Sequence, residues 1–167
     1  SFQITRLFRS LSVRDNLAFA ARAAGPGNFS AWRPRRGDDE AHAQAAQVLQ
    51  RVGLSAKAAQ AIDQLSHGEQ RALEVGMTLV ARPRLVLLDE PMAGMGAEES
   101  EAMGELIAGL RQDCAVLLIE HDVQAVFRLA DSVSVLVSGR LIASGEPDAV
   151  RHDPAVVAAY LGDQEEL

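Results

Sequence analysis

The sequence predicts an α/β fold, with a parallel sheet covered by helices and joined to a helical subdomain. In the second half, two short and wholly apolar segments, Leu85–Leu88 and Ala115–Ile119, alternate with amphipathic helical patterns. Strands that are apolar on both faces are typical of a parallel sheet with helices on both sides. In the first half, apolar residues recur at helical spacing instead. We therefore expect a helical subdomain over residues 1–82 and a sheet-containing core over residues 83–167.

The first half shows start and stop signals for each expected helix. Ser12, with Asp15 three places on, suits a capped start, and Gly53 lies where a helix C-cap glycine belongs. The expected elements are a helix from Ser12 to about Ala24, a loop from Asn28 to Asp39, a helix with Ala41, Ala45, Val48, Leu49 and Val52 on one face, a short helix around Ala56 to Ile62, and a helix from Ser66 to Arg82.

The second half alternates strands with helices. After the first apolar strand, Met103, Leu106, Ile107 and Leu110 mark one stripe of a helix over residues 97–112. The elements that follow are a strand at 115–119, a helix at 123–130, a hairpin from strands 132–137 and 140–143 at the edge of the sheet, and two small helices at 147–151 and 154–160. This order supports one α/β core.

Composition narrows the functional classes. The 167 residues carry a net charge of -7 and a pI near 5.1, which argues against a nucleic-acid binder, since such proteins cluster Lys and Arg. Cys114 is the single cysteine, so no intrachain disulfide can form and a reducing compartment is expected. No apolar run approaches the roughly 20 residues that cross a bilayer, and the first residues do not resemble a signal peptide. We expect a cytoplasmic protein.

Ser66 and Glu69 form a capping-box pattern, with Gly68 between them. By itself, this pattern favours a well-capped structural helix. A helix N-terminus with free amides and a small glycine also suits an anion such as phosphate. The pattern alone leaves both interpretations open.

Acidic residues end the first apolar strand. Asp89 and Glu90 come directly after Leu88, at the edge where α/β sheets place their ligands. Asp89 would hold Mg²⁺ through water, and Glu90 would polarise an attacking water. The second strand leads to His121, and consecutive strands of a parallel sheet are often neighbours. We expect His121 to emerge beside the acidic pair. A lone carboxylate pair more often supplies a helix N-cap and a surface glutamate, and a lone histidine is usually a turn residue.

In this order and spacing, the segments resemble the nucleotide-binding subunits of ABC transporters, over essentially the whole chain. Gln3 matches the Q-loop, Leu65–Gln70 the signature motif, Leu85–Glu90 the Walker B strand and His121 the switch histidine. The resemblance implies a partial P-loop NTPase core, of the ABC ATPase type, with a helical signature subdomain. It also implies ATP and Mg²⁺ as cofactors.

The same resemblance assigns roles to individual residues. Glu90 would be the catalytic base, and Gln3 and His121 would sense the γ-phosphate. Asp89 and Gln3 would contact Mg²⁺ through ATP or water. The signature residues that would bind ATP held by a second, identical or different, ATPase subunit are Ser66, Gly68, Glu69 and Gln70. Transmembrane permease subunits would be the other partners, so membrane association, at the inner face, would be indirect.

Two longer stretches narrow the resemblance to one group of these ATPases. "LFRSLSVRDNLAFAARA" and "DPAVVAAYLGD" are similar to ATPases of branched-chain amino acid importers and their amide or urea relatives. In that group, the arginines of the 28–39 loop, Arg33, Arg35 and Arg36, would contact the permease. A solvated loop is an equal interpretation.

The sequence also departs from the family. The P-loop pattern G-x-x-x-x-G-K-[ST] is absent from these residues, because the only lysine, Lys57, lies between Ala56 and Ala58. We expect the residues to be part of a longer protein, and expect the 167-residue chain alone neither to bind ATP tightly nor to hydrolyse it. Exposed apolar surface on the Walker B strand would then promote association. Gly96 stands where the family's D-loop usually has aspartate, and His67 where glycine is common.

Two other functions stay open on the sequence. One is a non-catalytic interaction or dimerisation module derived from an ABC ATPase. The other is a soluble ABC ATPase outside transport, although its nucleic-acid contacts would need basic patches that a net charge of -7 does not supply. A P-loop in an adjoining sequence would favour the transport ATPase over the interaction module.

Overall fold

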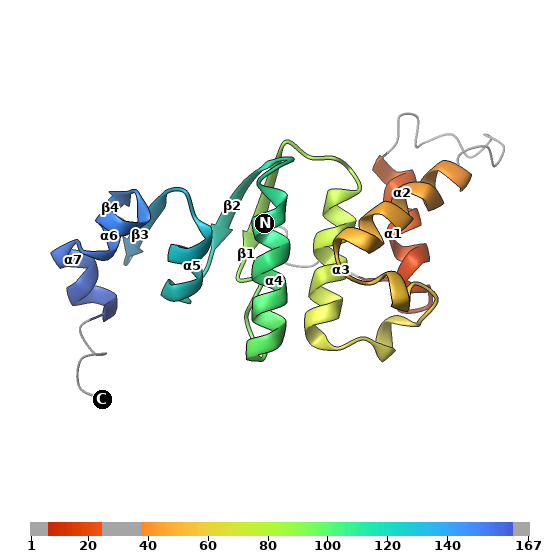
Figure 1. Cartoon of the computed structure of the whole chain (residues 1–167), viewed down its shortest axis with the longest axis horizontal. Helices are drawn as coiled ribbons and strands as arrows, with labels where there is room; N and C mark the ends of the chain where they lie inside the picture. The colour runs from red at the N-terminus through yellow and green to blue at the C-terminus, as the bar shows by residue number, and fades with distance from the viewer. Residues whose placement is uncertain (1–6, 25–37, 162–167) are drawn as a thin grey trace. The chain divides into compact units, whose positions relative to one another are not determined.

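The computed structural model describes residues 7–24 and 38–161, which combine helices with a parallel sheet as expected (Figure 1). The chain divides into two compact units, residues 1–117 and residues 118–167. The expected boundary after residue 82 stays a prediction.

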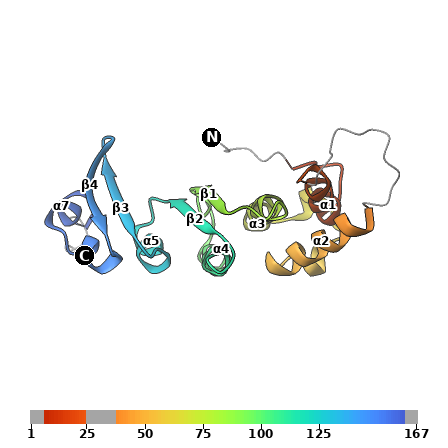
Figure 2. The same cartoon turned by 90° about the horizontal axis from the view of Figure 1, so that it is seen from above.

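Unit 1 contains the helical subdomain and the first strands. Its elements are α1 (Val13–Ala24), α2 (Asp38–Arg51), two 3₁₀ turns (Ser55–Lys57 and Ile62–Gln64), α3 (His67–Leu79), β1 (Leu85–Asp89), α4 (Ala97–Leu110) and β2 (Ala115–Ile119), whose last residues belong to unit 2. β1 and β2 are hydrogen-bonded neighbours in a two-stranded parallel sheet. Helices α1, α2 and α3 lie side by side (Figures 1 and 2).

The start of α1 follows the expected capping chemistry. Ser12 Oγ accepts a hydrogen bond from the Asp15 backbone N–H at 3.1 Å and donates to the Asp15 carboxylate at 2.7 Å. One turn later, Asn16 is fully buried, the single buried polar residue in the described part of the chain. Its side chain bonds the backbone of the segment before the helix, accepting from Phe8 N–H at 2.8 Å and donating to Phe8 C=O at 3.1 Å. These hydrogen bonds fix how the chain enters α1.

One apolar core joins the three helices of the subdomain. Leu17 of α1, Ala45 of α2 and Leu73 of α3 are all fully buried in it. Gly76 lets α3 approach closely, because a Cβ atom there would lie 3.1 Å from Val48 and 3.3 Å from Leu17. The helical face predicted for α2 is therefore the one that is buried, and the chain leaves it at Gly53 with φ 73°, the left-handed C-cap that favours glycine.

The short helix expected around residues 56–62 was wrong. Two 3₁₀ turns replace it, because carbonyl groups of this segment serve α1 instead of a helix of their own. Gln60 C=O accepts from Val13 N–H at 3.0 Å, and Ala58 C=O accepts from Arg14 N–H at 2.9 Å. These bonds satisfy free amides at the start of α1. A continuous helix would have used the same carbonyls internally.

Three helix ends fall slightly earlier than expected. α3 ends at Leu79, before Arg82 takes a left-handed φ of 48° ahead of Pro83. α4 ends at Leu110, whose carbonyl accepts from the N–H groups of residues 113 and 114. α5 (Val123–Leu129) ends one residue before the expected position. None of these ends has a C-cap glycine to mark it in the sequence.

The described residues cover β1 on one face only. Val86 and Leu88 are buried, whereas Leu85 is 54% and Leu87 59% exposed. The prediction of a sheet buried on both faces therefore fails for this strand within the described residues. Apolar side chains at adjacent positions of one face form the kind of surface that proteins usually cover.

We expect the 167-residue chain to associate through this face. Leu87→Lys should lower the apparent mass at high protein concentration, because a charged side chain opposes burial of the face. Sedimentation velocity over a concentration series measures this effect. Thr78→Lys adds the same charge at an exposed position of α3 and serves as the control. A wild-type chain that stays monomeric throughout the series would contradict the prediction.

Unit 2 holds a β-hairpin and small helices. Its elements are α5, β3 (Val133–Val137), β4 (Arg140–Gly145), α6 (Pro147–Arg151), α7 (Pro154–Val156) and a π-helical turn (Val157–Leu161). Ser138 and Gly139 have φ values of 50° and 75°, as a tight two-residue hairpin turn requires. The hairpin is confirmed, but in the described residues it forms a sheet of its own and does not extend the β1–β2 sheet. Among the described helices, none is both long and apolar enough to span a membrane.

Candidate functional site

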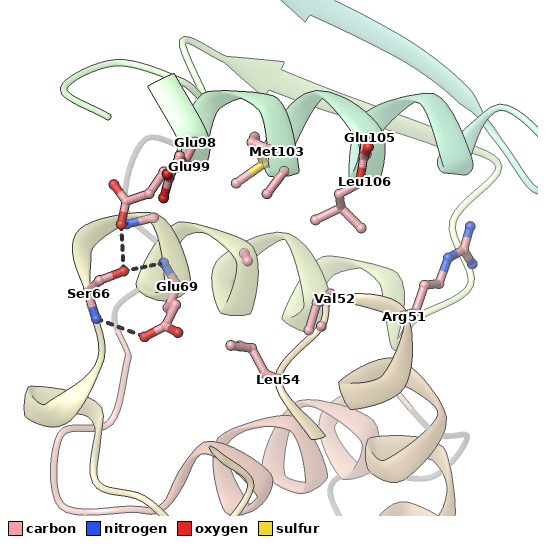
Figure 3. Close-up of a pocket in the computed structure, with 14 residues that line it drawn as sticks. Arg51, Val52, Leu54, Ser66, Glu69, Glu98, Glu99, Met103, Glu105 and Leu106 are labelled. Atoms are coloured by element: carbon pink, nitrogen blue, oxygen red, sulfur yellow. Dashed lines mark hydrogen bonds between the residues drawn. The ribbon is translucent and has the colours of Figure 1, made fainter. Parts of the chain in front are cut away.

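The N-terminus of α3 carries the capping box that the sequence predicts. Ser66 Oγ accepts from Glu69 N–H at 3.3 Å, and the Glu69 carboxylate accepts from Ser66 N–H at 3.0 Å (Figure 3). This exchange satisfies two of the backbone N–H donors at the start of the helix. The amide of Gly68 remains directed out of the helix, toward α4. The turn is therefore rigid and presents donors at its tip.

A carboxylate from α4 occupies this tip. Glu99 Oε1 lies 2.6 Å from Ser66 Oγ, which donates to it, and 3.3 Å from the Gly68 backbone nitrogen. Figure 3 shows Glu99 reaching from α4 to the Ser66 turn. The Ser66 hydroxyl, the Gly68 and Gly96 amides and the nearby His67 ring lower the pKa of the Glu99 carboxyl below its usual value. The start of α3 thus binds an anion supplied by the same chain.

The Ser66–Glu99 contact lies at one end of a cleft between α3 and α4. The cleft has a volume of about 550 Å³ and opens to solvent. Its apolar lining includes Leu54, Met103 and Leu106, and carboxylates surround that lining (Figure 3). The cleft is large enough for a group larger than phosphate to reach the N-terminus of α3.

Glu69 has a second partner. Lys57 Nζ donates to its carboxylate at 2.7 Å, and this hydrogen bond, together with the one from Ser66 N–H, lowers the pKa of Glu69. Both partners of the Glu69 carboxylate, Lys57 Nζ and Ser66 N–H, belong to the same chain. Gln70 is likewise turned inward, since its side-chain amide donates to Leu65 C=O at 3.1 Å. Their roles toward a nucleotide stay predictions.

The Glu69 contacts predict a pH dependence of stability. Because the pKa of Glu69 is lower in the folded chain than in the unfolded chain, its contribution is fully present above the usual value of 4.5 and is lost as pH falls through the lowered pKa. Urea unfolding at pH 7 and in steps down to pH 3 should show wild type and Glu69→Gln converging at the acidic end. Glu101→Gln, an exposed change on α4, is the control. A difference that stays constant across the series would contradict the assignment.

Asp89 and Glu90 lie where the sequence places them, at the carboxyl end of β1. Both are exposed, and Glu90 has a left-handed φ of 45°. A non-glycine residue holds this conformation at a cost of about 1 kcal/mol or more. The turn after it is closed by a hydrogen bond from Ala93 N–H to Glu90 C=O at 3.2 Å. The chain therefore fixes the direction of Glu90 through a strained backbone, as is common at functional sites.

The structure does not determine where the other expected site residues lie relative to Asp89. His121 belongs to unit 2; its side chain is 72% exposed, and its Nδ1 lies 3.9 Å from the Glu120 carboxylate. Gln3 and the arginines Arg33, Arg35 and Arg36 lie outside the described residues. The expected meeting of Asp89, Gln3 and His121 at one phosphate stays a prediction.

Carboxylate oxygens such as those of Asp89 suit Mg²⁺, which proteins usually hold with one or two carboxylates together with substrate phosphates. Within residues 7–24 and 38–161, no group of three histidine, cysteine or acidic side chains is arranged to hold a metal alone. Asp89 therefore fits one position of a Mg²⁺ site that a nucleotide would complete. It does not fit a metal centre built by this part of the chain alone.

Sequence reasoning missed Glu99. The residue stands at N3 of α4, three places after the N-cap Gly96, which suggests a local capping role at most. Its contact with Ser66 joins positions 33 residues apart. Only the packing of α3 against α4 reveals it.

Comparisons with known proteins agree with these motifs. The family model described as "ABC transporter" matches residues 1–93, and one described as "Branched-chain amino acid ATP-binding cassette transporter" matches residues 140–166. The "High-affinity branched-chain amino acid transport ATP-binding protein LivG" of Escherichia coli K12 is 38% identical over 170 residues, covering 98% of this chain and 67% of that protein. The protein named BraF, from Pseudomonas aeruginosa, gives the same identity and coverage.

A solved structure shows the same fold. MJ1267, described as an ATP-binding cassette of an ABC transporter in its ADP conformation, superposes with a TM-score of 0.75 at 27% identity, covering 92% of this chain and 64% of that one. The chain thus spans about two thirds of the length of the proteins it matches. With a family model matching more than half of its residues and a relative 38% identical along nearly all of it, the chain belongs to the ABC transporter family, within its ATP-binding proteins.

Proposed function

We propose that the protein acts as the ATP-binding and ATP-hydrolysing subunit of an importer for branched-chain amino acids or related amides. The observation that carries the proposal is the 38% identity to LivG and BraF along 98% of the chain, reinforced by the match of residues 140–166 to a branched-chain amino acid family model. The strained backbone of Glu90 at the end of β1 supports a functional site there.

In this proposal, residues at the start of α3 and residues at the end of β1 have different roles. Ser66 and Gly68, at the start of α3, donate to the γ-phosphate of ATP held by a second ATPase subunit. Asp89 binds Mg²⁺ through water, and the ion neutralises phosphate charge when it is bound. Glu90 accepts a proton from the attacking water. Gln3 and His121 contact the γ-phosphate, as expected from the sequence.

The partners follow from the same role. A second ATPase subunit, identical or different, would hold the ATP that Ser66 and Gly68 contact, and permease subunits would hold both ATPase subunits at the inner face of the membrane. The 167-residue chain, tested as such, should hydrolyse no ATP. Hydrolysis by that chain which Glu90→Gln abolishes would contradict this part of the proposal.

Uptake by cells tests the transport role. Deletion of the gene that contains these residues should remove high-affinity uptake of labelled leucine, and the natural protein should restore it. Labelled urea, measured in the same cells, separates an amide importer from an amino acid importer. Unchanged uptake of both compounds after deletion would contradict an importer of either class.

A further inference from the structure

The N-terminus of α3 is already in contact with an anionic group of its own chain. Glu99 accepts from Ser66 Oγ at 2.6 Å and from Gly68 N–H at 3.3 Å. These two donors are the ones that the proposed function assigns to a phosphate. A hydroxyl hydrogen and an amide hydrogen cannot each serve two anions at full strength, so carboxylate and phosphate exclude one another here.

We propose that Glu99 is an internal competitor for phosphate at the start of α3, an autoinhibitory contact that must open before an anionic ligand binds. The inference rests on the proposed function of that turn. It adds a regulatory residue from α4 that the signature segment itself does not contain.

Steric contact, in addition to charge, supports competition between Glu99 and a phosphate. A Cβ atom placed on Gly68 would lie 2.8 Å from Glu99 Cδ and 2.9 Å from Glu99 Cβ. The Glu99 side chain therefore lies directly against the backbone of the turn and fills the space that a phosphate oxygen needs. A phosphate cannot reach both donors while this side chain stays in place.

The Glu99 carboxylate keeps another hydrogen-bond partner when it releases Ser66 and Gly68. Its carboxylate interacts with the Gly96 backbone N–H, at the N-cap of its own helix, so it can still cap α4 after releasing Ser66. Its neighbourhood holds charges of both signs, with His67 on α3 beside it and Glu98 and Glu69 lining the same cleft. The side chain is only partly buried at the end of an open cleft, so rotation toward solvent meets no packed core.

A purely structural role makes a different prediction. If Glu99 only ties α4 to α3, its removal lowers stability and leaves phosphate affinity unchanged. If it competes, its removal raises phosphate affinity whatever happens to stability.

Amide chemical shifts of the 167-residue chain distinguish the two. Sodium phosphate is titrated at pH 7 against sodium chloride of equal ionic strength, and the Gly68 amide is followed. Glu99→Ala should bind phosphate about tenfold more tightly than wild type, since a charge-assisted hydrogen bond no longer competes. Glu99→Gln, which keeps the size of the side chain, should show a smaller gain and covers the case in which the alanine variant folds poorly.

Glu98→Ala is the matched control, because it removes the same charge one residue away in the lining of the same cleft. An equal gain in Glu98→Ala would overturn the inference in favour of a general charge effect. Equal affinity in wild type and Glu99→Ala would overturn the inference alone and leave the proposed function standing. No response of Gly68 in any variant would also overturn the inference, because the turn would then bind no phosphate by itself, and the proposed function, in which a second subunit holds the ATP, would stand.

Discussion

Glu90→Gln is expected to lower ATP hydrolysis by about a hundredfold or more in the natural protein that contains these residues, while ATP still binds. An amide of the same shape cannot take a proton from the attacking water. Because Glu90 sits at φ 45° on a turn closed through its own carbonyl, the substitution leaves the backbone constraint in place and changes only the proton acceptor.

Steady-state phosphate release, together with equilibrium binding of labelled ATP, measures the two effects separately. Glu98→Gln makes the same chemical change in the first turn of α4 and should retain hydrolysis. A Glu90→Gln protein that keeps more than half of the wild-type rate would show that another group accepts the proton. Loss of ATP binding in the variant would instead indicate a structural role for Glu90.

Local chemistry explains why so much of the fold could be predicted. The cap at Ser12, the left-handed Gly53 and the Ser66–Glu69 exchange each involve residues a few positions apart, so their signals are complete in the sequence. The two apolar strands are confirmed for the same reason: runs of four or five aliphatic or small residues between turn signals have few other stable conformations.

Tertiary hydrogen bonds explain the failures. The segment around Ala58 and Gln60 looks helical in isolation, yet its carbonyls are used by α1, more than 40 residues earlier in the chain. The exposed Leu87 is a failure of another kind, because wholly apolar strands predict burial on both faces and the described residues cover only one. Neither outcome is encoded within a window of neighbouring residues.

In the candidate site, too, local features could be predicted from the sequence and tertiary features could not. The position of Asp89 and Glu90 at a strand end follows from local pattern and is confirmed. The strain at Glu90 and the carboxylate of Glu99 at the start of α3 depend on how the chain is packed, and the sequence signals neither. The meeting of Asp89 with His121 joins two units and stays a prediction.

Asn16→Leu is expected to destabilise unit 1 by about 1–3 kcal/mol, because the Phe8 N–H loses its hydrogen-bond acceptor. The side chain of Asn16 is fully buried and serves both the N–H and the C=O of Phe8, besides donating to Ser12 C=O at 2.9 Å. Leucine fills a similar volume but has no polar atom, so the Phe8 N–H is left without its acceptor at a cost of about 1–3 kcal/mol. Phe8 C=O keeps its hydrogen bond from Leu11 N–H, and Ser12 C=O keeps the one from the backbone N–H of residue 16.

Urea unfolding followed by circular dichroism measures the loss, with Gln47→Leu as the control because it exchanges an exposed amide of α2 for the same side chain. The control should change the free energy of unfolding by less than about 0.5 kcal/mol. Equal stability of Asn16→Leu and wild type would mean that water replaces the amide at the entry to α1. That outcome is disfavoured here, since no part of the Asn16 side chain reaches the surface and the groups it bonds converge on it from a single turn of chain.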